Sequence, residues 1–207
     1  MEHFTSGWED EYSRRGLLWG GTTQGLPIIP AGSRVLEIGC GNGKTLSSMV
    51  QREWDVTALD FSRQAVAMSR GLCSGASSFE FMVADTLHLP FKKTSFDAVL
   101  AIHIMGHLPE PERKLLPHHL KNILKPDGIL FFSDFSTGDF RFGSGHETEP
   151  ATFKRGTGII THYFSCQEVL DLFSSLKLDW IRIHEWPLRI LGKNLVHSEI
   201  KAVFTRK

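Results

Sequence analysis

The stretch Val35-Leu36-Glu37-Ile38-Gly39-Cys40-Gly41-Asn42-Gly43 decides the fold of this chain. It begins as an apolar run that is typical of a buried strand and continues into three glycines at alternate positions. Glycine tolerates positive φ angles and lets a ligand approach the backbone closely. Residues 44–51 then follow a helical pattern, with Leu46, Met49 and Val50 on one face. A strand, a glycine-rich turn and a helix in this order predict a ligand site at the turn, where free N–H groups point outward.

Two acids stand where neighbouring strands are expected to end. Residues 56–60 form a second short apolar run that ends in Asp60, and a third run at 79–83 is followed closely by Asp85. Asp60 lies about 20 residues beyond the glycines, where a β-α-β unit carries its ribose-binding carboxylate. Ligands of parallel sheets bind outside the carboxyl ends of the strands. We therefore expect both acids and the glycine turn on one edge of a parallel sheet.

Five motifs of the sequence resemble those of class I S-adenosylmethionine-dependent methyltransferases. They are Glu37-x-Gly39-x-Gly41-x-Gly43, Leu59-Asp60-Phe61-Ser62, Ala84-Asp85-Thr86-Leu87-His88-Leu89-Pro90-Phe91, Ser95-Phe96-Asp97-Ala98-Val99 and Leu124-Lys125-Pro126-Asp127-Gly128-Ile129-Leu130. Their order is most similar to the small, single-domain enzymes called type 11, and the match covers residues 33–134. The resemblance implies an α/β, three-layer α/β/α Rossmann-like fold. Its seven-stranded, mostly parallel sheet would have an antiparallel last strand.

Length and composition favour one globular unit. The 207 residues are expected to form a single methyltransferase domain, with a lid segment at 1–32, a cofactor-binding core at 33–134 and an acceptor-binding part at 135–207. Lys plus Arg equal Asp plus Glu at 23 each, so no overall positive field favours nucleic acid. Three cysteines without a paired spacing, and no signal peptide or spanning apolar run, predict a cytoplasmic protein without a membrane partner. A monomer or homodimer is expected.

The rest of the chain supplies the remaining elements. Helices are predicted over 63–72 and 166–176, each capped by the serine before it, and over 109–124, where Pro117 should interrupt the helix. Further strands are predicted over 96–102, 128–133, 178–186 and 198–205, the last two being the antiparallel sixth and seventh strands. Residues 134–163 are predicted to be a long functional loop.

The resemblance also implies roles for the cofactor-side residues. Gly39 and Gly41 would offer backbone groups to the amino-acid end of S-adenosylmethionine, and Glu37 would orient its amine. Asp60 would accept from both ribose hydroxyls, which suits the two oxygens of a carboxylate. The adenine would meet the following residues: Phe61 on its face, Asp85 at its amino group, and Thr86 or Leu87 at its ring. Cys40, Ala101 and Trp19 complete the predicted cofactor set.

The N-terminal segment is a candidate lid. A short helix is predicted over 8–15, and in similar methyltransferases such a segment lies over the cofactor. Tyr12 and Trp19 are therefore lid candidates with Gly20-Gly21 as a hinge, although both aromatic residues could instead only cap the sheet edge. For Trp8 we expect that purely structural role.

Methyl transfer is an in-line displacement in which the protein mainly aligns the two partners. A general base helps only if the acceptor must lose its proton. His103, just beyond the fourth strand, is the candidate base, with His107 and His146 as further candidates. His107-Leu108 also resembles a packing pair of this family. The predicted acceptor-binding residues are Tyr12, His107, Arg141, His146, Arg155 and Tyr163, although a charged stretch of this kind can also be a solvated face.

Several chemistries are not supported. The fourth strand is followed by neither the Asn- or Asp-Pro-Pro-aromatic element of amino-group methylation nor a Pro-Cys nucleophile, and no residues have metal-ligand spacing. Asp97 and the turn 125–128 are expected at the opposite edge. The sequence thus predicts methyl transfer to oxygen, nitrogen or sulfur of a small molecule. The alternatives are a tRNA-modifying enzyme, with a basic patch of Arg141, Lys154, Arg155 and Arg189, and a non-catalytic cofactor-binding subunit. A nicotinamide dehydrogenase is least favoured because it requires G-x-G-x-x-G.

Overall fold

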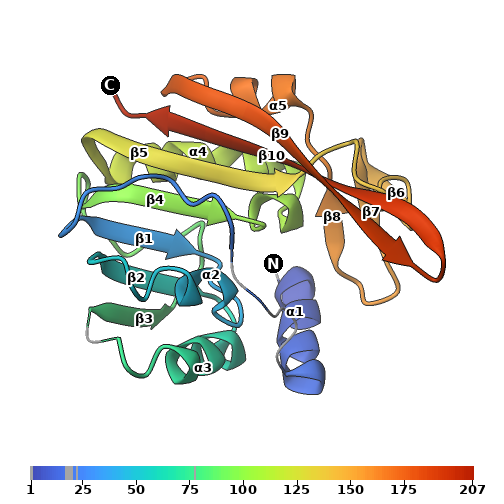
Figure 1. Cartoon of the computed structure of the whole chain (residues 1–207), viewed down its shortest axis with the longest axis horizontal. Helices are drawn as coiled ribbons and strands as arrows, with labels where there is room; N and C mark the ends of the chain where they lie inside the picture. Colours follow the sequence, from blue (N-terminus) through green and yellow to red (C-terminus); the bar gives the residue numbers. More distant parts are fainter. Residues whose placement is uncertain (1, 17–20, 22, 77) are drawn as a thin grey trace.

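A seven-stranded sheet in the order β3-β2-β1-β4-β5-β10-β9 forms the centre of the computed structural model (Figure 1). The structure describes residues 2–16, 21, 23–76 and 78–207. The strands of the sheet are β1 (Arg34–Ile38), β2 (Asp55–Asp60), β3 (Phe79–Val83), β4 (Phe96–Ile102), β5 (Leu124–Phe135), β9 (Lys177–Ile190) and β10 (Lys193–Thr205). β1 to β5 are parallel to one another, and β10 is antiparallel to both β5 and β9. The predicted fold class is confirmed. Of the last two strands, β10 is antiparallel to β5, whereas β9 is antiparallel to β10 and so runs in the same direction as β5.

Helices cover both faces of this sheet. They are α1 (Glu2–Arg15), α2 (Lys44–Ser47), α3 (Arg63–Leu72), η1 (Met105–His107), α4 (Glu110–Ile123) and α5 (Cys166–Leu172). α4 and α5 pack on the face that carries Leu36 and Val99, and α2 packs on the face that carries Val35 and Leu100. Successive strand residues point to opposite faces, so two core layers bury these strands on both sides. No helix of the described residues is long and apolar enough to cross a membrane.

Several helix predictions were wrong in extent: α1 begins at Glu2 and not at residue 8, and α5 ends at Leu172 and not at residue 176. The helix after the glycine turn ends at Ser47, and Val50 is 46% exposed although Leu46 and Met49 are buried. α4 continues through Pro117, which lies inside the helix and is buried with Leu116 and Leu120. Packing of this apolar face against the sheet outweighs the backbone hydrogen bond that a proline cannot make.

The segment predicted to be one long loop contains a second sheet. Its strands are β6 (His146–Glu149), β7 (Thr152–Lys154) and β8 (Ile160–His162), joined antiparallel in the order β6-β7-β8. Strands of three or four residues with charged side chains carry too little periodicity to be recognised in a sequence. Figure 1 shows this small sheet beside the far end of the β9–β10 hairpin.

The opposite edge of the main sheet is tied by Asp97, as expected. Its carboxylate lies 2.8 Å from Lys125 Nζ and accepts a hydrogen bond of 2.9 Å from the Arg34 backbone N–H. These contacts join the starts of β1, β4 and β5, at the edge remote from the glycine turn.

Candidate active site

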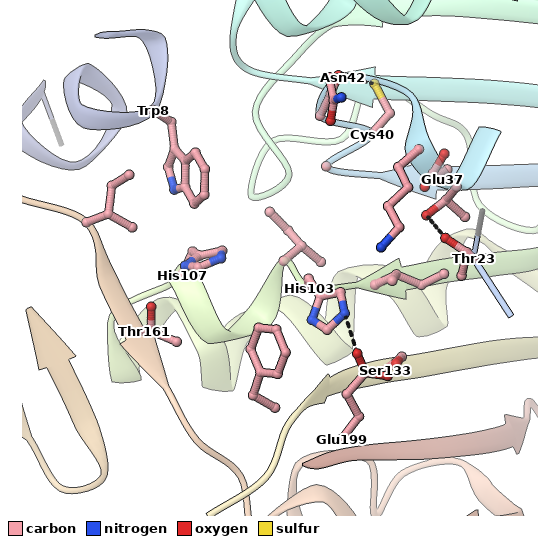
Figure 2. A pocket seen from close by; sticks show the side chains of 18 of the residues that line it. Trp8, Thr23, Glu37, Cys40, Asn42, His103, His107, Ser133, Thr161 and Glu199 are labelled. Atoms are coloured by element: carbon pink, nitrogen blue, oxygen red, sulfur yellow. Dashed lines mark hydrogen bonds and ion pairs between the residues drawn. The ribbon is translucent and has the colours of Figure 1, made fainter. Parts of the chain in front are cut away.

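A cavity of about 800 Å³ opens at the carboxyl ends of β1, β2 and β4. α1 contributes Trp8 and Tyr12, the glycine turn contributes Gly39 and Gly41, and the β9–β10 hairpin contributes residues from the opposite side. Figure 2 shows Trp8 above His107, with His103 and Glu199 farther along the same cavity. The cavity therefore has one half beside the glycine turn and a second half between α1, β8 and the hairpin.

The glycine turn has the backbone that its sequence predicts. Gly39, Gly41 and Gly43 have φ angles of 69°, 54° and 87°. A Cβ atom on Gly41 would lie 2.8 Å from Tyr12 Oη, so α1 lies directly over the turn. Burial and the nearby Asp60 charge raise the pKa of Tyr12, which keeps this phenol neutral.

Asp60 holds the turn from the end of β2. One carboxylate oxygen accepts from the Gly41 N–H and the other from the Ser62 N–H, each at 2.9 Å. Burial raises the pKa of Asp60 to about 6 despite these bonds. Glu37, only 2% exposed, has its pKa raised to about 8, also mainly by burial. Two buried acids on one wall favour a bound group that brings hydroxyl donors or a positive charge.

His103 and His107, which follow β4 in the chain, lie in opposite electrostatic environments. His103 Nε2 is 3.0 Å from Glu199 Oε1, and its Nδ1 is 3.7 Å from Asp134 Oδ1, which is an ion-pair distance but too long for a hydrogen bond. Burial lowers the pKa of His103, but the two carboxylates outweigh it and raise the pKa to about 9. His107 has its pKa lowered, first by burial. At neutral pH, therefore, His103 is a cation and His107 is neutral.

This charge state argues against the predicted role of His103. A general base must be unprotonated to accept a proton, and His103 is protonated below about pH 9. Its φ of 50° and its stacking on Phe135, with ring centroids 4.4 Å apart, fix the imidazole between its carboxylate partners. His103 is better explained as a fixed positive charge in the cavity wall.

The comparisons with known proteins agree with this geometry. Residues 35–128 match a family described as Methyltransferase domain. This core is a class I methyltransferase domain. A demethylmenaquinone methyltransferase of Clavibacter sepedonicus is 32% identical over 120 residues, which are 58% of this chain and 48% of the relative. A tRNA N(3)-cytidine methyltransferase of Gallus gallus is 29% identical over 168 residues, 75% of this chain and 45% of the relative.

Solved structures share the methyltransferase fold. A SAM-dependent methyltransferase of Methanosarcina mazei superposes with a TM-score of 0.72 at 21% identity, covering 86% of this chain and 94% of its own. The chain spans about half the length of the sequence relatives it matches. Their substrates are therefore properties of those proteins.

The methyltransferase domain brings most predicted cofactor residues to the cavity wall. Those that line it are Glu37, Gly39, Cys40, Gly41, Asp60 and Phe61. Asp85 instead accepts from the Leu87 N–H at 2.9 Å and contacts His88 at 3.0 Å, within its own turn. Thr86, Leu87 and Ala101 are buried and, like Asp85, are not among the lining residues. Their cofactor roles stay predictions, and Trp19 lies outside the described residues.

The acceptor-side residues divide in the same way. The fold places Tyr12, His107, Arg141 and Arg155 in the cavity wall, whereas His146 is exposed on β6 and outside the wall. Tyr163 is fully buried, and its hydroxyl accepts from Arg155 Nη2 at 2.8 Å, so it orients Arg155. Arg141 is paired with Asp139 at 2.7 Å and lies 3.7 Å from the centre of the Phe135 ring.

Sequence reasoning missed several wall residues. Trp8, expected only to pack, lines the cavity with its ring centroid 4.7 Å from that of His107. Trp186, His197 and Glu199 come from the hairpin, within the acceptor-binding part predicted at 135–207, but no motif singled them out individually. Among the described residues, no group of His, Cys, Asp or Glu is arranged to hold a metal ion.

Proposed function

We propose that this chain binds S-adenosylmethionine and transfers its methyl group to oxygen, nitrogen or sulfur of a small molecule. The observation that carries the proposal is the shared cavity, into which the glycine turn, Asp60 and a polar second half all open. The amino-acid end of the cofactor lies against Gly39 and Gly41, with Glu37 near its amine. Because the sulfonium is already an activated methyl donor, the wall mainly aligns donor and acceptor.

Asp60 has the acceptor capacity that a ribose needs. An ionised carboxylate offers about four lone-pair sites on two oxygens. The N–H groups of Gly41 and Ser62 occupy one site on each oxygen. Each oxygen therefore keeps a site for one of the two ribose hydroxyls, and the same contacts fix the carboxylate against the glycine turn.

Arg155 is the residue best placed to attract a polar or anionic part of the acceptor. Its Nη2 donates to Tyr163, its buried Nε has no hydrogen-bond partner, and no carboxylate of the described chain forms an ion pair with it. A buried, unsatisfied guanidinium donor is costly unless a ligand supplies the acceptor. Arg141, by contrast, is held by Asp139 and forms part of the wall.

Calorimetric titration with S-adenosylhomocysteine tests the cofactor assignment. We expect saturable binding, and the absence of binding at millimolar concentration would refute the proposal. Incubation with labelled S-adenosylmethionine and separate pools of small molecules and tRNA then tests the acceptor class. Label in the small-molecule pool is the expected result.

Replacing Gly41 by alanine is expected to weaken S-adenosylhomocysteine binding. At φ 54° an alanine is strained by about 1–3 kcal/mol, and its Cβ would lie 2.8 Å from Tyr12 Oη, displacing α1 from the turn. Calorimetry should show a several-fold loss of affinity. Gly75→Ala is the matched control, because Gly75 has open space around its Cβ position and should bind as the wild type does. Equal affinities of the two variants would contradict the proposed contact.

A tRNA substrate is the second candidate, favoured by the tRNA N(3)-cytidine methyltransferase that matches 75% of this chain. The positions of the four basic residues count against it. Arg141 and Arg155 face the cavity, while Lys154 and Arg189 are exposed elsewhere, so they do not gather into the patch that a tRNA enzyme would need. Label in the tRNA pool would reverse this ranking. A non-catalytic subunit would bind the cofactor and label neither pool. The single domain, monomer or homodimer, and cytoplasmic location stay predictions.

A further inference from the structure

We infer that His107 is the general base of the methyl transfer and that the acceptor is a hydroxyaryl compound, whose hydroxyl group loses its proton to this imidazole. The inference rests on the proposed function and narrows its acceptor from any oxygen, nitrogen or sulfur compound to one chemical class. Three features carry it: the tautomer of His107, the charges around it and the flat walls of the acceptor half, which is the half of the cavity between α1, β8 and the β9–β10 hairpin.

A backbone carbonyl fixes the tautomer of His107. Its Nδ1 lies 2.7 Å from the carbonyl oxygen of Ile160 in β8. A carbonyl oxygen only accepts hydrogen bonds, so Nδ1 must carry the hydrogen. In the neutral imidazole, Nε2 is then left with a free lone pair, because the hydrogen bond of this ring to the described residues is made through Nδ1. His107 thus has the orientation and tautomer of a base.

Burial and the charges around His107 keep it neutral at physiological pH. Burial is the largest cause of its lowered pKa, and the imidazolium of His103 and the guanidinium of Arg141 act in the same direction. Asp134 in β5 and the Ile160 carbonyl act against them, but the pKa of His107 is lowered overall. From α1, Glu11 lines the same cavity, while β8 contributes the uncharged Thr161. His103 is thus a fixed cation, and His107 is a free base.

Trp8 packs directly against this base. Its indole meets the imidazole of His107 edge to face, at 4.7 Å between centroids and an angle of 70° (Figure 2). Because α1 carries Trp8 and also covers the glycine turn through Tyr12, one helix spans both halves of the cavity. A proton accepted at Nε2 is therefore transferred inside a partly enclosed site.

The walls of the acceptor half suit a flat ring. Trp8 of α1, Trp186 of β9 and His197 of β10 all line it. Rings of this kind stack on aromatic ligands in offset or edge-to-face arrangements. The acidity of the acceptor hydroxyl also favours a hydroxyaryl compound, because a phenolic hydroxyl with a pKa of about 10 releases its proton to an imidazole far more readily than an alkyl alcohol does.

The step balances without a further reactant. The O–H bond of the acceptor breaks, and its proton moves to His107 Nε2. The oxygen lone pair forms a bond to the methyl carbon as the bond from carbon to sulfur breaks, and that electron pair stays on sulfur. The products are an aryl methyl ether, neutral S-adenosylhomocysteine and a protonated His107, which returns its proton to water.

The tautomer can be tested without any acceptor. In the full chain labelled with nitrogen-15 histidine and saturated with S-adenosylhomocysteine, His107 should show the Nδ1–H neutral form at pH 7. It should titrate below the usual value of about 6.5. Loss of the signal in His107→Gln assigns it. An imidazolium or an Nε2–H tautomer at pH 7 would overturn the inference.

Activity provides the second test, with catechol and 4-nitrocatechol as probes at pH 8. His107→Gln should lower kcat for catechol about 100-fold, the lower end of general-base effects. The loss should be much smaller for 4-nitrocatechol, because its nitro group already favours the ionised form. His118→Gln, exposed on α4, should leave both rates unchanged. Equal losses on both probes would contradict the base, and wild-type enzyme that methylates neither would contradict the acceptor class.

These outcomes are separable from a failure of the proposed function. S-adenosylhomocysteine should bind His107→Gln within about twofold of wild type, because the cofactor lies in the other half of the cavity. If wild type itself fails to bind S-adenosylhomocysteine, the proposed function is refuted. If it binds but the histidine or probe results are negative, only the inference about His107 falls.

Discussion

Asp60→Ala is expected to lower the affinity for S-adenosylhomocysteine at least tenfold. The variant loses the charged hydrogen bonds to the ribose, which contribute about 1.5–3 kcal/mol, or roughly 10- to 150-fold in affinity. It also loses the bonds by which the carboxylate holds the N–H groups of Gly41 and Ser62. Calorimetry measures the affinity directly, and Asp60→Asn should lie between alanine and wild type because it keeps one oxygen.

Asp97→Ala is the matched control for this experiment. Asp97 is also an acid at a strand of the same sheet, and it also accepts a backbone N–H, but it lies at the opposite edge with Lys125. Its loss should reduce thermal stability without changing cofactor affinity. If Asp60→Ala bound S-adenosylhomocysteine as tightly as Asp97→Ala, while remaining folded, Asp60 could not be the ribose ligand.

His103→Gln is expected to destabilise the fold by about 3 kcal/mol near pH 6.5. Removing one partner of a buried ion pair costs about 3–5 kcal/mol, because the remaining charge is left unpaired. Asp134 is 1% exposed and Glu199 is 8% exposed, so both carboxylates would lose their nearest cation. The lower end of the range applies because Asp134 also accepts from the Gly106 and Phe135 N–H groups.

The stabilisation from His103 should depend on pH. Its pKa is raised from 6.5 to about 9 in the folded protein, so the native state binds the proton more tightly than the unfolded chain does. The contribution is therefore complete below about pH 6.5 and is lost as the pH rises through 9. Urea unfolding at pH 6.5 and 9.5 should show a large difference between wild type and His103→Gln at the lower pH and a small one at the higher.

His88→Gln is the control for this pH series. His88 also contacts a carboxylate, Asp85, at 3.0 Å, but its side chain is 70% exposed. Exposed pairs contribute little, so this variant should follow wild type at both pH values. Glu37 and Asp60 also titrate in this range, but they are present in every variant, and the difference between variants isolates His103.

The cofactor half was predictable because its signals are local. The three glycines need their positive φ angles whatever surrounds them, and Asp60 follows directly from the end of an apolar strand. Pro117 shows the limit of such reasoning. Its local preference is to end a helix, but the buried face that it shares with Leu116 and Leu120 holds α4 together.

The sequence by itself determined where β1, β2 and β3 lie along the chain, the glycine turn and the acid at the end of β2, because each depends on residues close together in the chain. Only the tertiary structure decided which residues of α1, η1, β8 and the β9–β10 hairpin meet in the acceptor half. The charges of two neighbouring histidines show why. Glu199 and Asp134 make His103 a cation, while burial keeps His107 neutral and the Ile160 carbonyl sets its tautomer, and these partners are far from both histidines in the sequence.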